Sequence, residues 1–281
     1  MEAVVMTTTM ATTNAPKTPT RKKKRGKASD RTLAVVLGGG FIVVGLIIWQ
    51  LAASLGLINT FLASSPALMA EALYNEVATG ILLESLRISG YEFLIGFSLA
   101  AVVGVTVGLA MGRYWLIEYT LDPYVWLLYS SPTLALFPLM VLVFGLGTPA
   151  VIFMTFLLSV VPIIVNSSQG VRNVDKQLVQ AAVSFGAGEF SLLTKVVLPA
   201  SVPTIMAGIR LGLGRALVGV IVGEFFAGDG GIGFNINHYA STLETSRVLG
   251  SVVVVVVIGL TLYFLARRLE AIADSWRVDA D

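Results

Sequence analysis

The chain has 281 residues, of which 56% are hydrophobic and 13% are charged. Soluble globular domains carry about 25% charged residues, so this composition, with a mean hydropathy of +0.83, predicts a polytopic membrane protein. The formal net charge of +2 is small, and the positions of the charges matter more than their sum. Because the sequence has no cysteine and only one histidine, His238, it excludes disulfides and thiolate chemistry, and no metal site is expected.

The first 31 residues differ in composition from everything that follows. They are rich in Thr and Ala, and they contain a basic run from Arg21 to Arg25. Such a segment cannot bury a core, so residues 1–31 are expected to form a disordered basic cytoplasmic tail, separate from a membrane domain over 32–281. No aromatic residue accompanies the basic run, so a nucleic-acid partner is not expected. A cleaved signal peptide is not expected either, because the following apolar stretch is too long.

Six stretches are apolar over about the 20 residues that a membrane-spanning helix needs. They are residues 33–55, 90–111, 121–146, 149–169, 204–226 and 247–266, which predicts an all-α protein. The third is interrupted by Pro132 and Pro138, and the fourth by Pro162. Proline favours kinks, and a bilayer tolerates them where other helices or a water-filled cavity satisfy the freed carbonyls. The prolines therefore indicate either simple kinks or helices that bend around a pathway.

Lysine and arginine set the expected orientation. With the amino terminus inside the cell, the cytoplasmic segments hold 15 of the 19 basic residues. The positive-inside rule then places both termini in the cytoplasm. Residues 56–86 become a long, partly helical outer segment, and residues 227–246 become an outer loop that contains the glycine-rich turn Gly228–Gly233.

Glycine-rich runs provide no nucleotide site in this sequence. A phosphate-binding loop ends in Gly-Lys-Ser/Thr after a strand, whereas Gly212–Arg215 lies inside an expected span and Gly228–Gly233 follows one. Glycine inside a span favours close helix packing. With no nucleophile–base pair evident either, no catalytic residue is assigned, and the chain is not expected to be an enzyme.

The central stretch, about residues 172–203, is polar in an otherwise apolar chain. By the charge distribution it lies in the cytoplasm. Its apolar residues recur every three or four positions, which predicts two short amphipathic helices; these residues are Leu178, Ala181, Ala182, Phe185, Phe190, Leu193, Val196 and Val197. Gly186–Gly188 is the expected bend between them, and Pro199 the expected end of the second. The pattern suits a docking loop for another protein or an interfacial helix that rests on lipid.

The spacing within this stretch resembles the EAA loop of ABC importer permeases. That pattern is Glu-Ala-Ala, three residues, Gly, nine residues, Ile, one residue and Leu-Pro. The corresponding residues here are Gln180, Ala181, Ala182, Gly186, Val196, Leu198 and Pro199. The resemblance implies that these residues form a coupling helix docked on an ATPase subunit. Gln180 stands where the pattern has glutamate, so a charged contact there would become a neutral hydrogen bond.

The resemblance extends over about residues 60–270 and is closest to the nitrate/sulfonate/taurine-type permeases. The motifs that carry it are Asp122-Pro123, Ser131-Pro132, Leu136–Pro138, Phe144–Gly147, Gly208–Leu211, Gly223-Glu224 and Gly231–Phe234. It implies a type I ABC importer permease fold with six transmembrane helices in a bacterial or archaeal cell membrane.

The resemblance also implies a set of partners and a substrate class. These are a second permease copy, two ATP-binding cassette subunits and an extracytoplasmic solute-binding protein. ATP would be hydrolysed by the cassette subunits, and no cofactor would be bound directly by this chain. The implied substrate is a small anion such as a sulfonate, taurine or nitrate. A permease for amino acids, polyamines or neutral heterocycles is the alternative, and a secondary transporter is a further one, although no inverted repeat or set of coupling carboxylates is evident.

Ionisable residues in the fifth expected span are the candidates for a pathway. Charged groups at membrane depth usually face a bundle interior or a cavity. Arg215 lies near the middle and is the best candidate to attract an anion, with pairing to a carboxylate as the alternative. Arg210 is near the cytoplasmic end and is expected to snorkel to the interface. Glu224 is near the outer end, where a structural hydrogen bond is as reasonable as substrate contact.

Overall fold

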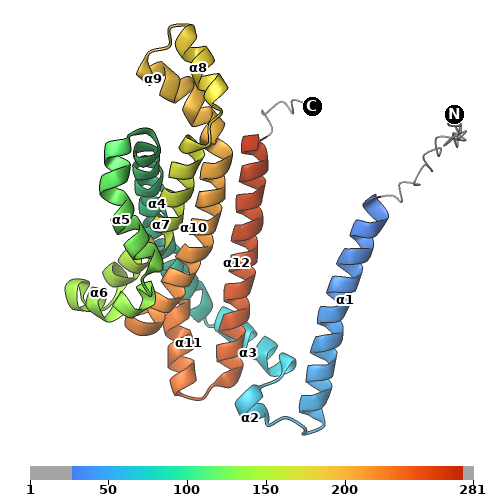
Figure 1. Ribbon diagram of the computed structural model, residues 1–281. Coiled ribbons are helices and arrows are strands. Elements are labelled where there is room, and N and C mark those ends of the chain that lie inside the picture. Colours follow the sequence, from blue (N-terminus) through green and yellow to red (C-terminus); the bar gives the residue numbers. More distant parts are fainter. Residues whose placement is uncertain (1–26, 275–281) are drawn as a thin grey trace, which may run out of the picture. The chain divides into compact units, whose positions relative to one another are not determined.

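The computed structural model describes residues 27–274, and all the regular structure within that range is helical (Figure 1). The chain up to Ile48 forms one unit and the chain from Trp49 onward a second. The elements are α1 (Lys27–Ser54), α2 (Thr60–Ala63), α3 (Pro66–Ala78), α4 (Ile81–Arg113), α5 (Trp115–Ser130), the 3₁₀ turn η1 (Thr133–Leu136), α6 (Phe137–Phe144), α7 (Thr148–Arg172), α8 (Lys176–Ser184), α9 (Glu189–Leu192), the π-helical segment η2 (Leu193–Val197), α10 (Leu198–Ala227), α11 (Ile232–Ser241) and α12 (Thr245–Asp274).

Five helical stretches among the described residues are long and apolar enough to cross a membrane. They are Leu37–Ser54, Ile81–Arg113, Thr148–Arg172, Glu189–Ala227 and Thr245–Glu270, which match five of the six expected spans. The third expected span, 121–146, is instead a pair of helical segments, Trp115–Ser130 and Thr133–Phe144, that meet at 91°. Counted as one broken span, this pair brings the total to six.

Two expected boundaries shift in the structure. Helix α1 begins at Lys27, so residues 27–31 of the expected tail are helical, while residues 1–26 of that tail lie outside the described range. Helix α4 begins at Ile81, well before residue 90. The sequence places the start of this helix too late because Glu84 and Arg87 lower the mean hydropathy of its first turns. These turns nevertheless belong to the bundle, since Ser85 and Ser89 are buried there.

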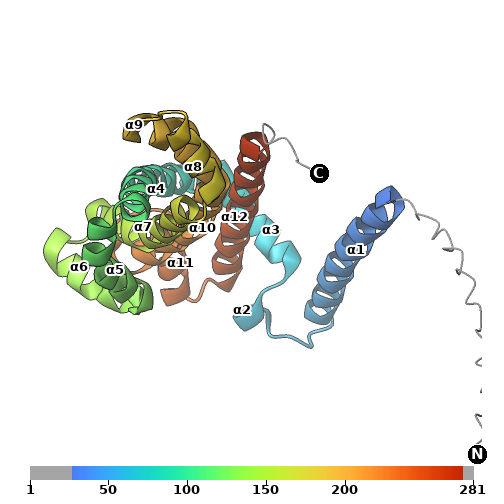
Figure 2. The same ribbon diagram turned by 45° about the horizontal axis from the view of Figure 1, so that its top comes forward.

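Helix α7 is the centre of the bundle and packs against both α4 and α10, which also contact each other (Figures 1 and 2). On α4 the contact runs along glycines at helical spacing: Gly96, Gly104, Gly108 and Gly112. A Cβ atom on Gly108 would lie 2.5 Å from the Cβ of Ser167 and 2.7 Å from the carbonyl oxygen of Ile164. The backbones of α4 and α7 are therefore too close to admit even a methyl group.

Helix α10 approaches α7 just as closely. A Cβ atom on Gly219 would lie 2.7 Å from the Cα of Thr155, and one on Gly208 would lie 2.6 Å from the Cβ of Asn166. In a bilayer, lipid tails are as apolar as side chains, so helices associate through close packing of small residues. The glycine rows of α4 and α10 give α7 two such contacts.

Two polar side chains of α7 inside this core are satisfied by their own helix. The hydroxyl of Thr155 donates to the carbonyl of Val151 at 2.8 Å, and that of Ser159 donates to the carbonyl of Thr155 at 2.5 Å. Both residues are fully buried. Local bonds of this kind allow hydroxyls to occupy an apolar interior without the cost of an unpaired donor.

The two ends of the bundle carry different elements. Helices α8 and α9 extend beyond the ends of α4 and α7, at what we call the loop end, while α11 lies at the opposite end (Figures 1 and 2). Arg113 at the end of α4 pairs with Glu189 of α9 at 2.8 Å, and Arg172 at the end of α7 pairs with Glu118 of α5 at 2.6 Å. The first ion pair fastens α9 to the bundle, and the second joins α5 to α7 at the same end.

The close contact between α4 and α7 gives a direct test. Gly108→Ala should destabilise the protein by about 1–3 kcal/mol, because the added methyl group overlaps the backbone of α7. Thermal unfolding of the detergent-solubilised protein measures this as a lower melting temperature. Gly90→Ala is the matched control in the same helix, since a Cβ atom there meets nothing within 4 Å. Equal melting temperatures for the two variants would contradict the packing described.

Candidate functional site

The break between α5 and α6 shapes a cavity inside the bundle. Ser131 is extended, with φ −69° and ψ 141°, as expected for a residue that precedes proline. Pro132 has no N–H to continue the helix, and Pro138 lies in the first turn of α6. The chain therefore turns through 91° here and does not cross as one straight helix.

A cavity of about 240 Å³ lies where the broken span faces α7 and α10. Tyr129 and Thr133 line it from the broken span, Pro162 from α7, and Leu211 and Arg215 from α10. Pro162 of the fourth expected span thus lines the cavity, together with residues on both sides of the break in the third. The expectation that these spans bend around a cavity agrees with this arrangement.

Arg215 is the cation of this cavity. Its side chain is exposed in the single chain, and no described carboxylate lies within 4.0 Å of it. A guanidinium at membrane depth with no countercharge is costly. The arrangement is therefore suited to attract an anion, because a bound anion would supply the missing charge.

Arg210 has a different environment. It forms a part-buried ion pair with Glu270 of α12, a partner that was not predicted from the sequence. Five residues separate Arg210 from Arg215, which turns their side chains about 140° apart around α10. One arginine joins α10 to α12 while the other faces the cavity.

Glu224 lies at the far end of α10 and does not line the Arg215 cavity. It is fully buried, and its Oε2 accepts a hydrogen bond from the backbone N–H of Gly233 at 2.7 Å. Gly231 has φ +98°, and a Cβ atom there would collide with the Glu224 carboxyl group. Glu224 therefore holds the glycine turn between α10 and α11.

Glu92 of α4 was not singled out from the sequence. It is fully buried beside Glu224, and no described group hydrogen-bonds to either of its carboxyl oxygens. Its position does carry a signal, because Glu92 lies inside the expected span 90–111, whereas the exposed Glu84 lies in the expected outer segment, and an ionisable residue at membrane depth is a candidate for function.

The central loop forms a second candidate site, and its second helix differs from the expectation. Helix α8 starts at Lys176 and is capped by Asp175, whose carboxylate accepts a hydrogen bond from the N–H of Gln177 at 2.8 Å. After the bend at Gly186, where φ is +82°, the chain forms α9, passes through the π segment and continues into α10. Pro199 does not end a helix: it lies in the first turn of α10, where a missing N–H is tolerated. The loop therefore joins a continuous helical rod, Glu189–Ala227.

The apolar residues of the loop divide into two faces. Val179 and Ala182 point inward and pack on the buried cluster of Val171, Leu192 and Val197. Other apolar side chains point outward, with exposed fractions of 53% for Leu178, 92% for Phe185 and 79% for Phe190. The outward face is the one that either expected role, docking on another protein or resting on lipid, would use. An exposed apolar patch of this kind marks an interaction surface.

The seven loop residues picked out by spacing occupy different environments. Ala181 and Gly186 are exposed beside Phe185, and Gln180 is exposed and lines a cavity between α8 and the ends of α4 and α7. Ala182, Val196, Leu198 and Pro199 are partly buried at the base of the loop. Phe185 and Phe190 were not chosen as site residues. Their position in the motif gives no indication of exposure, because the bend at Gly186 determines which way they point.

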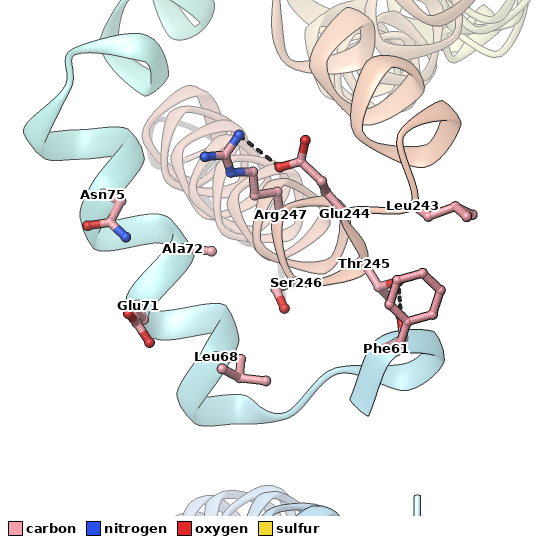
Figure 3. Close-up of a pocket in the computed structure, with 10 residues that line it drawn as sticks. All are labelled: Phe61, Leu68, Glu71, Ala72, Asn75, Leu243, Glu244, Thr245, Ser246 and Arg247. Atoms are coloured by element: carbon pink, nitrogen blue, oxygen red, sulfur yellow. Dashed lines mark hydrogen bonds and ion pairs between the residues drawn. The ribbon is translucent and has the colours of Figure 1, made fainter. Parts of the chain in front are cut away.

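A further cavity of about 510 Å³ lies at the opposite end of the second unit, between α2, α3 and the start of α12 (Figure 3). Arg247 there pairs with Glu244 at 2.9 Å, and the hydroxyl of Thr245 donates to the carbonyl of Phe61 at 2.8 Å. Behind them, burial raises the pKa of Glu76, and it raises the pKa of Tyr239 to about 12. These contacts fasten the α11–α12 turn to α2 and α3. No residue chosen from the sequence lies in this cavity.

Metal chemistry has no evident place in the described range 27–274. No three side chains among His, Asp and Glu gather there closely enough to hold an ion. What the two candidate sites offer is a cation in a cavity and an exposed apolar loop, which are features of binding.

Comparison with known proteins agrees with these features. A family model described as "Binding-protein-dependent transport system inner membrane component" matches residues 100–277. The aliphatic sulfonates transport permease protein SsuC of Escherichia coli K12 is 35% identical over 84% of this chain and 90% of its own. The taurine transport system permease protein TauC of the same organism is 30% identical over 86% and 90%. The riboflavin transport system permease protein RibX of Chloroflexus aurantiacus is 30% identical over 82% and 86%.

Solved structures agree on the fold. A chain of the MetNI methionine ABC transporter, in an inward facing conformation, superposes with a TM-score of 0.61 at 18% identity. It covers 69% of this chain and 96% of its own length. The helical bundle is therefore the type I ABC importer permease fold. With a family model that matches most of its length and relatives above 30% identity, the chain belongs to the binding-protein-dependent transport family and is a membrane-spanning permease subunit of an ABC importer.

Proposed function

We propose that this permease imports a small organic anion by alternating access, and that ATPase subunits docked on the central loop drive the change. The observation that carries the proposal is Arg215, an arginine without a described countercharge in a cavity between the broken span, α7 and α10. An arginine fork matches the oxygens of a sulfonate or carboxylate group.

The relatives support an anionic substrate class. SsuC and TauC are named for aliphatic sulfonates and taurine, and both classes of compound carry a sulfonate group. RibX is named for riboflavin, so a neutral heterocycle is the second candidate. Tyr129 lines the same cavity and could stack on such a ring. The two candidates differ in whether the substrate needs the charge of Arg215.

The central loop is the proposed docking site for the ATPase. Phe185, Ala181 and Leu178 share one exposed face of α8 and its end. Small residues beside a large exposed aromatic allow another protein to approach closely and to bury that aromatic, which is how interface anchors gain affinity. ATP would be bound and hydrolysed by the docked subunit, since this sequence carries no phosphate-binding loop.

Coupling follows from the continuity of the rod that begins at Glu189 and carries Arg215. Movement of the docked loops toward or away from each other would turn this rod, and with it one wall of the cavity. Nucleotide can drive the change only by favouring one of two states of the assembly. Glu189 is joined to Arg113 of α4, so α4 would move with the loop.

The remaining assembly follows from topology. The loop end carries Arg113, Arg172 and Lys176 and is the proposed cytoplasmic side, with both termini inside. Because Arg215 is exposed on the single chain, we propose that a second permease copy closes the cavity. Two cassette subunits would dock below, and a solute-binding protein would deliver substrate to the α11 end.

Substitution of Arg215 tests the substrate class. Arg215→Gln should reduce uptake of an anionic substrate by about tenfold or more, since a charge-assisted contact contributes more than about 1.4 kcal/mol. The measurement is uptake into proteoliposomes that contain the full complex, with sulfonate, taurine and riboflavin as substrates.

Arg210→Gln is the matched control for stability. It leaves Glu270 without its partner and should lower the melting temperature, whereas Arg215→Gln should not. Anion uptake that survives Arg215→Gln would contradict the proposed role. Riboflavin uptake that survives while anion uptake is lost would agree with it.

The docking role is tested by Gly186→Asp. A charged side chain beside Phe185 should prevent close approach of the ATPase, so that pull-down of the ATPase and substrate uptake are both lost. Gly56→Asp is the matched control, because Gly56 also has a positive φ, of +71°, and open space around its Cβ position. Normal pull-down and uptake with Gly186→Asp would show that the ATPase docks elsewhere.

A further inference from the structure

The cavity beside Gln180 has an uneven set of charges. It measures about 390 Å³ and lies between α8 and the ends of α4 and α7. Three cations line it, namely Arg113, Arg172 and Lys176, and no carboxylate does. Gln180 is the remaining polar side chain in its wall, and the other residues are apolar or glycine.

Two of the three cations are already paired outside the cavity. Arg113 contacts Glu189 at 2.8 Å and Arg172 contacts Glu118 at 2.6 Å, and neither glutamate lines the cavity. Lys176 is exposed and has no described carboxylate within 4.0 Å. The three cations and the two glutamates that pair with them therefore carry one uncompensated positive charge, that of Lys176.

The side chain at position 180 decides whether that charge is balanced within the chain. A glutamate there would place a carboxylate in the same wall as Lys176 and both arginines. Glutamine has the same size and shape but no charge, so the cavity stays positive. Opposite charges within about 4–6 Å attract strongly where water is partly excluded, and a partner that closes the cavity would exclude more water.

We infer that this cavity receives a carboxylate side chain from the docked ATPase subunit. The inference rests on the proposed docking and adds to it the chemistry of the partner. Gln180 and Lys176 lie about 160° around α8 from Leu178, but Gln180 directly precedes the exposed Ala181 and is itself exposed, so a partner that covers Ala181 reaches this edge of the helix. An acidic residue at the edge of the docking surface would thus meet the cavity while Phe185 is buried, and the lysine would gain the counterion that Gln180 does not provide.

The test is the affinity of the full-length permease for its ATPase subunit, measured by titration in nanodiscs of neutral phosphatidylcholine. Gln180→Glu should weaken binding about tenfold, because a carboxylate in the cavity repels the incoming one and balances Lys176 in its place. Lys176→Gln should weaken it in the same direction. Wild-type binding should also fall more steeply with salt than binding of the Gln180→Glu variant.

Gln177→Glu is the matched control. It makes the same charge change on the same helix, but Gln177 does not line the cavity. Binding should change by about twofold or less, as for an ordinary surface substitution. Equal melting temperatures of the three variants and the wild type would establish that folding is unaffected.

Other results would overturn the inference. Tighter binding of Gln180→Glu would mean that the partner presents a cation, and unchanged binding would mean that it presents no charge there. A loss seen only in nanodiscs with anionic phosphatidylglycerol would assign the cavity to a lipid phosphate. Gly186→Asp separates this inference from the docking proposal: if it abolishes binding while Gln180→Glu has no effect, docking stands and the carboxylate does not.

Discussion

The close approach of α7 to both α4 and α10 is the constraint on which the other features depend. Glycines on both outer helices let the three backbones come within reach of direct contact. In a bilayer no hydrophobic effect holds helices together, so this contact has to be made by packing alone. The cavity at Arg215, the turn at Glu224 and the base of the central loop are all built on these three helices.

Most of the charged residues in this apolar frame hold structure, whereas Arg215 and the buried Glu92 have no described partner. Glu224 holds a glycine turn, Arg210 holds α12, and Arg113 and Arg172 hold the loop end. Each has a described partner in the same chain. Arg215 lacks one, and it lies beside the bend of the broken span. An unpaired charge at membrane depth lowers the stability of the single chain. Its presence there therefore points to a function.

The helical class, the approximate spans and the family pattern could be predicted from the sequence, because hydropathy and residue spacing are local. The place where the third span breaks was indicated by Pro132, but not that the break amounts to 91°. The amphipathic spacing of α8 was visible, yet it did not separate the exposed Leu178 and Phe185 from Val179 and Ala182, which pack on the bundle. Periodicity places residues on a common face but does not say which neighbour that face meets.

Long-range partners were the other kind of feature that the sequence did not reveal. Glu270 and Glu92 gain their roles only when α12 and α4 come beside α10. The continuous helical stretch Glu189–Ala227 was not predicted from the sequence, for a related reason. Pro199 suggests a helix end by its chemistry, but it also suits a first turn, and the choice depends on the residues before it.

Those preceding residues include the π segment Leu193–Val197. A π turn holds one more residue than an α-helical turn, so everything beyond it is rotated by about 100° relative to an unbroken α-helix. The angular position of Arg215 is therefore fixed at a point five turns away, close to the loop. If this single wide turn tightened to an α turn, the whole rod would swivel about its axis, and the arginine would leave the cavity without any bend in the helix. A change in the π segment would thus rotate α10 relative to the loop, and with it Arg215 relative to the cavity.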